Sequence, residues 1–222
     1  MRLLLVRLLN MLIGLVFYAA GIVLMINANI GYAPWEVFHV GLANTIGLTI
    51  GVTSIIAGIV IVIIVTVLGE ELGFGTICSM VLTGVFIDIL FYMELIPVMD
   101  NLFAGTVMLI SGLFIIALGS YFYMKSAFGI GPRDNLMVVL AKKTRLPVGL
   151  CRSVIELLVT VIGWLLGGMV WFGTIISVIA VGFFIQIVFR IFKFDVTSIK
   201  HENLAESAKN IKNLFTPKPK NE

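Results

Sequence analysis

The residues with the clearest chemical potential in this sequence are an arginine and a glutamate four positions apart, Arg152 and Glu156. On a helix this spacing places both side chains on one face, within pairing reach. Both lie in an apolar segment, where an ionisable group is costly and is usually paired or directed at a cavity. We interpret them either as a substrate-binding or proton-coupling pair, or as an internal ion pair that fixes the helix against its neighbours.

Two further polar residues, Asp88 and Gln186, lie within apolar segments at equivalent places of an internal repeat described below. One interpretation makes them two polar walls of a central site shared with Arg152 and Glu156. The alternative is that they form interhelical hydrogen bonds that hold a helix bundle together.

Two carboxylates, Glu36 and Asp134, each follow a proline by two residues. A carboxylate near the start of a helix is stabilised by free backbone N–H groups and by the positive helix end, which is the structural interpretation. The functional interpretation makes Glu36 and Asp134 gates of a transport path.

The neighbours of these carboxylates differ between the two places. Trp35 precedes Glu36, whereas Arg133 precedes Asp134 and Asn135 follows it. We include all of them among the substrate-binding candidates. Arg133 has the alternative of binding lipid phosphate at the inner leaflet.

No arrangement in the sequence indicates an enzyme. It has no phosphate-binding glycine loop with its lysine, no His/Cys/carboxylate set at metal spacing, and no Ser or Cys paired with a nearby His. Cys78 and Cys151 are too few for a disulfide framework. We therefore expect no catalytic residues, no cofactor, no metal ion and no nucleic-acid partner.

The composition places the chain in a membrane. Apolar residues make up 60% of it and charged residues only 12%, and no Lys or Arg occurs between Arg7 and Lys125. Such a segment could not form a soluble surface. Segments of about 20 apolar residues are long enough to cross a hydrocarbon layer of about 30 Å. We expect six spans, at about 10–30, 50–69, 74–95, 103–124, 148–167 and 172–192, and short interfacial or re-entrant helices at about 35–46 and 133–145.

One half of the sequence repeats the other at an offset of 98 positions, without a gap. The Gly/Pro break at residues 31–36 returns at 129–134, and the segment 74–77 returns at 172–175. A fixed period over about ninety residues indicates a duplicated unit. Three spans in each copy force the second copy to enter from the opposite side, so the copies are expected to be inverted.

Positive charge predicts the orientation, because cytoplasmic loops carry the excess of Lys and Arg. A cytoplasmic amino terminus places the first two arginines, the basic loop at 125–145 and the cluster at 190–193 on the same side. The break at Pro34 then opens outward and the break at Pro132 opens to the cytoplasm.

Several motifs in order resemble a known family. They are Gly31, Pro34, Trp35 and Glu36; Gly129, Gly131, Pro132, Arg133 and Asp134; Arg152 with Glu156; Gly167-Gly168; and the turns Gly75-Thr76 and Gly173-Thr174. Over about residues 10–193 the chain is similar to the YczE/YyaS/YitT family of bacterial integral membrane proteins. Glu36 stands where the family is expected to show Asp. The resemblance implies a multispan protein of the bacterial inner membrane.

These observations predict an all-α membrane protein with six transmembrane helices in two inverted three-helix repeats, each with a broken helix and a short interfacial or re-entrant helix. Residues 1–193 form one transmembrane domain, with repeats at about 10–96 and 108–193, and 194–222 form a cytoplasmic tail. Broken helices in inverted repeats favour an alternating-access permease for a small molecule or ion. The alternative is a non-transporting scaffold or accessory partner of another assembly. Besides the lipid bilayer, the expected partners are the transported solute and a second copy in a homo-oligomer.

Overall fold

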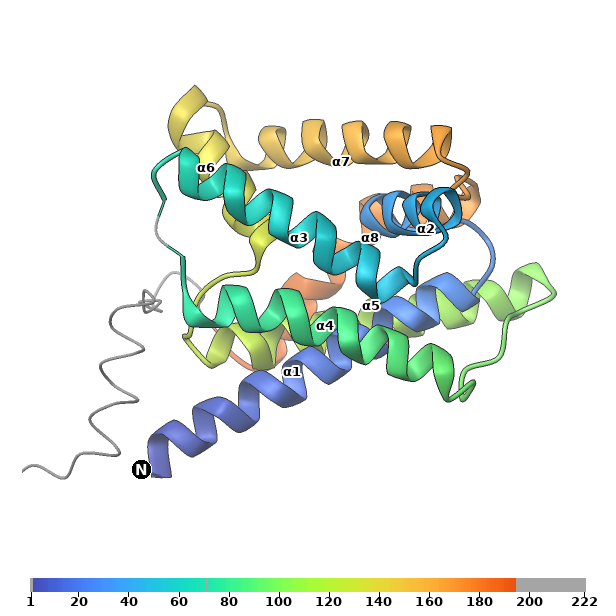
Figure 1. Ribbon diagram of the computed structural model, residues 1–222. Helices are drawn as coiled ribbons and strands as arrows, with labels where there is room; N and C mark the ends of the chain where they lie inside the picture. The colour runs from blue at the N-terminus through green and yellow to red at the C-terminus, as the bar shows by residue number, and fades with distance from the viewer. Residues whose placement is uncertain (1, 71, 195–222) are drawn as a thin grey trace, which may run out of the picture.

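The computed structural model describes residues 2–70 and 72–194, and it is helical throughout with no strand in those ranges (Figure 1). The predicted tail at 194–222 lies, apart from its first residue, outside the described residues. The helices are α1 (Arg2–Asn27), α2 (Pro34–Ile46), α3 (Ile50–Val67), α4 (Phe74–Tyr92), α5 (Leu102–Lys125), α6 (Pro132–Thr144), α7 (Val148–Leu165) and α8 (Phe172–Ile191).

Six of these helices are long and apolar enough to cross a membrane, which confirms the expected number of spans among the described residues. They are α1, from Leu4, and α3, α4, α5, α7 and α8 in full. The first span begins about six residues earlier than predicted and ends at Asn27. The predicted start is too late because the arginines at the beginning of the segment suggested that the span begins after them. The predicted end is too late because Asn27 and Asn29 lie close to the end of the apolar run.

The two short helices are α2 and α6, of 13 residues each. Each begins at a proline in its first turn, where the missing N–H costs no helical hydrogen bond. The break before each helix contains a glycine with positive φ, +105° at Gly31 and +131° at Gly129. A side chain at either position would be strained, so glycine is required for the chain to turn there.

The helix bounds repeat at the offset found in the sequence. Helices α2, α3 and α4 begin at 34, 50 and 74, and α6, α7 and α8 begin 98 residues later, at 132, 148 and 172. The ends of α1 and α5, Asn27 and Lys125, are separated by the same interval.

The centre of the molecule is the crossing of α1 and α5, the most extensive helix pair. A Cβ on Gly14 would lie 2.8 Å from the carbonyl oxygen of Gly119, and one on Gly21 would lie 2.8 Å from that of Gly112. The later glycine of α1 contacts the earlier glycine of α5, so the two helices run antiparallel. Glycines at these four places let the backbones approach closely enough for direct contact.

The two breaks are held by the opposite halves of the chain. The N–H of Gly75, in the first turn of α4, donates to the Phe128 carbonyl at 2.7 Å. The N–H of Gly173, in the first turn of α8, donates to the Ile30 carbonyl at 2.6 Å. These are equivalent donors and equivalent acceptors, exchanged between halves.

One pair of helices departs from this correspondence. Helix α3 packs along α4, and a Cβ on Gly84 would lie 2.6 Å from the Gly51 carbonyl oxygen. Helices α7 and α8 have no comparable packing within the described residues, and nothing lies within 4 Å of a Cβ on Gly149 or Gly182. Helix α7 packs on α2, as α3 packs on α6, and forms the upper edge of the molecule in Figure 1.

Candidate functional site

A cavity of about 120 Å³ lies between the two halves of the chain. Seven helices line it, from α1 to α7, or the residues that lead into them. Its polar side chains come from both halves, and much of the remaining wall is apolar. The charged, aromatic and hydroxyl-bearing lining residues include Tyr18, Trp35, His39, Ser54, Ser79, Thr83, Ser120, Tyr123, Arg133, Asp134, Arg152 and Glu156.

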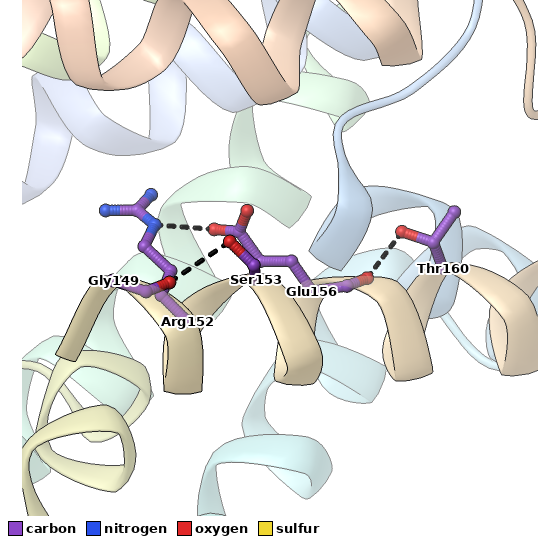
Figure 2. A network of polar contacts seen from close by, with 5 residues as sticks. All are labelled: Gly149, Arg152, Ser153, Glu156 and Thr160. Carbon is purple, nitrogen blue, oxygen red and sulfur yellow. Dashed lines mark hydrogen bonds and ion pairs between the residues drawn. The ribbon is translucent and has the colours of Figure 1, made fainter. Parts of the chain in front are cut away.

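Arg152 and Glu156 line the cavity from α7. Figure 2 shows the two side chains on the same face of this helix. Arg152 Nε donates to Glu156 Oε1 at 2.8 Å, as the spacing of four residues predicts. The terminal nitrogens of Arg152 point away from Glu156 in Figure 2 and make no hydrogen bond to the rest of the described chain. The Thr160 hydroxyl donates to the Glu156 carbonyl at 2.6 Å one turn further on.

A second ion pair joins the two short helices. Arg133 Nη1 of α6 lies 3.4 Å from Glu36 Oε1 of α2, and the guanidinium stands 4.9 Å from the centroid of the Trp35 ring. A cation over an indole face is attracted by the ring quadrupole. Arg133 therefore points into the protein at this junction, a placement that does not fit the lipid-phosphate alternative.

His39 completes this cluster as a neutral group. It is 1% exposed, and Arg133 Nη2 lies 3.4 Å from its Nδ1. Burial lowers the pKa of His39 well below its usual value, and the nearby Arg133 charge acts in the same direction. Because arginine can only donate, Nδ1 is assigned as the acceptor and Nε2 as the protonated nitrogen.

Asp134 lines the cavity without a partner of its own. Its equivalent in the first half, Glu36, is paired with Arg133, whereas the Asp134 carboxylate has no hydrogen bond or ion pair with any described residue. Burial raises the pKa of the Asp134 carboxyl, and the charges of Arg152 and Arg133 oppose that rise. The group is thus a partly buried acceptor at a part-open cavity, and no donor among the described residues satisfies it.

The four residues expected to form one central site do not meet. Arg152 and Glu156 line the cavity, but Asp88 lies at the α3–α4 contact, where Oδ1 accepts from the Gly51 N–H at 2.8 Å and Oδ2 accepts from the Thr49 hydroxyl at 2.6 Å. Gln186 is exposed on α8. The cavity wall does not include either residue.

Of the remaining candidates, Trp35, Arg133 and Asp134 line the cavity. Glu36 reaches it through Arg133, and Asn135 is buried beside it at 3% exposure without lining it. Sequence reasoning missed Tyr18 and Tyr123, which contribute aromatic rings from α1 and α5. Their repeat equivalents are apolar residues, so the internal repeat carried no signal for them. Among the described residues no three His, Cys, Asp or Glu side chains gather as they would around a metal ion.

Comparison with known proteins places this architecture in a family. Residues 5–190 match a family of unknown function, DUF6198. The chain belongs to this family. Its relatives include the uncharacterized membrane protein YczE of Bacillus subtilis, 33% identical over 176 residues that cover 78% of this chain and 80% of YczE.

Two further relatives match over similar lengths. An uncharacterized protein of Haemophilus influenzae is 28% identical over 172 residues, which cover 76% of this chain and 78% of that protein. The uncharacterized protein YyaS of Bacillus subtilis is 25% identical over 178 residues, which cover 79% of this chain and 88% of YyaS. No solved structure matches. Together with the six apolar helices, the similarity to YczE supports a multi-pass membrane protein.

Proposed function

We propose that this member of the YczE/YyaS group is an alternating-access permease for a small molecule or ion in the bacterial inner membrane, with both termini in the cytoplasm. Its two halves would be inverted repeats, and the cavity between them would be the transport site. The proposal assigns no catalytic step to the chain and treats Arg152, Glu156, Arg133 and Asp134 as the polar wall that meets the solute.

The contacts between halves support the inverted arrangement. Helices α1 and α5 are equivalent by sequence and run antiparallel, with Gly14 against Gly119 and Gly21 against Gly112. A twofold axis in the membrane plane relates inverted repeats in many transporters, and it requires equivalent helices to run in opposite directions. The reciprocal hydrogen bonds of Gly75 and Gly173 agree with the same axis.

The observation that carries the transport proposal is the difference between two equivalent helix pairs. Gly51 and Gly84 bring α3 and α4 into backbone contact, whereas their equivalents Gly149 and Gly182 face open space. Alternating access needs two halves that adopt different conformations and then exchange them. One pair is closed and the other is open, and three of these four helices, α3, α4 and α7, line the cavity. This is the asymmetry that a single state of such a cycle requires.

In the opposite state, α7 would close on α8 through Gly149 and Gly182, and α3 would separate from α4. The two hydrogen bonds that Asp88 accepts from Gly51 and Thr49 would break. Gln186, the equivalent of Asp88, would gain the Gly149 N–H as a donor. The ion pairs Arg133–Glu36 and Arg152–Glu156 lie on α2, α6 and α7, and they need not break when the protein changes between the two states.

A disulfide between α7 and α8 tests the exchange directly. Gly149→Cys and Gly182→Cys, introduced after Cys78→Ser and Cys151→Ala, have room in the present state because nothing lies within 4 Å of either Cβ. In the opposite state the two thiols would come within disulfide reach, about 4 Å between Cβ atoms. We expect an oxidant to trap the disulfide in membranes.

The matched control pairs Gly149→Cys with Phe183→Cys, the neighbouring exposed position on α8. This pair is expected to remain reduced. If Gly149→Cys and Gly182→Cys also stay reduced, in a protein that still folds, the halves do not exchange and the scaffold alternative replaces the permease.

A further inference from the structure

The charges around the cavity do not balance. Arg152 is paired with Glu156 at 2.8 Å, and Arg133 is paired with Glu36 at 3.4 Å. Each guanidinium thus has its own carboxylate. Asp134 is the remaining carboxylate of the wall, and no described cation lies within ion-pair distance of it. With all five groups ionised, the site carries one surplus negative charge.

An ion pair already made is a poor binding site for a second charge. An anionic solute would have to displace Glu36 or Glu156 from the arginine with which it is paired. Alternatively, it could bind the terminal nitrogens of Arg152, but the Asp134 carboxylate would then repel it. A cation needs no such exchange, because it meets a carboxylate that lacks a partner. Uncompensated charge in a low-dielectric space is costly, and an opposite charge in contact offsets that cost.

The apolar part of the wall restricts the kind of cation. Leu15, Ile61, Met80, Met124 and Met137 face the cavity. A hard metal ion prefers six or more oxygen ligands, and this wall offers few of them around Asp134. Flexible methionine side chains suit apolar groups of variable shape. The aromatic rings of Tyr18 and Tyr123 add faces that attract organic cations.

We propose that the cavity binds a small organic cation, with an ammonium or amidinium head on the Asp134 carboxylate and a short apolar body against the methionines. The inference rests on the proposed permease function of the same cavity and names the class of its solute. Asp134 is the residue that sets the sign of the charge accepted. Arg152 and Arg133, each neutralised by its own carboxylate, limit the head group to one positive charge.

Thermal unfolding of the purified protein in detergent tests the class of solute with four small probes that each contain three carbon atoms. These are propylammonium, propanol, propionate and the zwitterion β-alanine, each compared with sodium chloride at equal ionic strength. A ligand that binds only the folded state raises the melting temperature as its concentration rises. We expect propylammonium alone to give a saturable rise. A larger rise with propionate, propanol or β-alanine, or no difference from sodium chloride, overturns the inference.

Substitution then locates the charge. Asp134→Asn is expected to weaken propylammonium binding at least tenfold, and Asp100→Asn, an exposed loop carboxylate, is expected to leave it unchanged. If Asp134→Asn does not fold, Asp134→Glu keeps the charge and should retain binding. Unchanged affinity in Asp134→Asn would contradict the assignment, as would complete loss in Asp134→Glu with the fold intact.

This test separates the solute class from the permease function. No propylammonium binding together with a trapped disulfide between positions 149 and 182 removes the organic cation and leaves the permease. Propylammonium binding without that disulfide, and without uptake of the labelled amine by proteoliposomes, keeps the binding site and removes transport.

Discussion

Arg133 and Glu36 meet across the junction of α6 and α2, 97 residues apart in the chain, with Nη1 and Oε1 separated by 3.4 Å. They follow the two prolines that begin the short helices, so the same backbone breaks that interrupt the repeats also bring this pair together. The residue equivalent to Glu36 is Asp134, and the pairing therefore uses one carboxylate of the two and leaves the other to the cavity.

Removing the charge of Glu36 should destabilise the fold. Glu36 is 5% exposed, and Glu36→Gln leaves the Arg133 guanidinium without its carboxylate. Breaking a buried pair costs about 3 kcal/mol, whereas an exposed pair contributes about 0–1 kcal/mol. Thermal unfolding should show a clear fall for Glu36→Gln. The control Glu70→Gln, which removes a more exposed pair with Lys142, should shift little. Equal shifts would contradict the buried role of Glu36.

Charge balance predicts how Glu156 affects the organic-cation site. Glu156→Gln releases Arg152, whose terminal nitrogens have no other described partner, to neutralise Asp134. We expect propylammonium affinity to fall at least tenfold. Adding Arg152→Gln to the same chain removes the released charge and should restore most of the affinity. Loss in the single variant without recovery in the double variant would show that Glu156 contacts the solute itself.

Propylammonium binding should weaken as pH falls, because a proton competes for the same carboxylate. Burial raises the pKa of Asp134, so the competition begins at higher pH than for an exposed aspartate. The groups that face Asp134 are Arg152 of α7, Arg133 of α6, Tyr18 of α1 and Tyr123 of α5. Arginine and tyrosine side chains do not ordinarily titrate near neutral pH, which leaves Asp134 as the titrating group.

The measurement is the propylammonium dissociation constant at a series of pH values, lowered stepwise from neutral pH for as long as the protein stays folded. The empty protein should show the opposite trend in stability. Its raised carboxyl pKa favours folding at low pH, and that contribution is lost as pH rises through the folded pKa. A dissociation constant independent of pH would show that no carboxylate proton is displaced.

Weakening the α3–α4 contact should favour the opposite state. Asp88→Ala removes the acceptor of the Gly51 N–H and Thr49 hydroxyl bonds, which exist only while these helices are closed. A change that destabilises one state shifts the population to the other. The disulfide between Gly149→Cys and Gly182→Cys should therefore form several times faster. Asp100→Ala serves as the control, and a slower or unchanged rate in Asp88→Ala would place Asp88 outside the exchange.

Much of the fold could be predicted from the sequence because each feature has a local cause. Span length and hydropathy identify six helices, and Gly31 and Pro34 with their equivalents mark the short ones. The Arg152–Glu156 pair follows from helical spacing alone. The offset of 98 residues anticipates the equivalent helix starts.

The site could not be predicted to the same extent because its contacts depend on which helix faces touch. Asp88 was expected in a central site, but α3 lies against its face of α4 and supplies the donors it needs. Gln186 has no such neighbour because α7 and α8 are apart, so the repeat gave two equivalent residues different surroundings. The Arg133–Glu36 pair joins two segments whose spacing in the chain has no helical period, and nothing local indicates it.

The exchanged hydrogen bonds of Gly75 and Gly173 make each half of the chain a necessary part of the other. In a half-length polypeptide ending after α4, the Gly75 N–H would lack the Phe128 carbonyl as its acceptor. The Ile30 carbonyl would likewise lack the Gly173 N–H as its donor. Two such polypeptides related by a twofold axis would satisfy both needs at once. The two bonds therefore follow the pattern expected across the interface of a twofold-symmetric homodimer, here made within one chain.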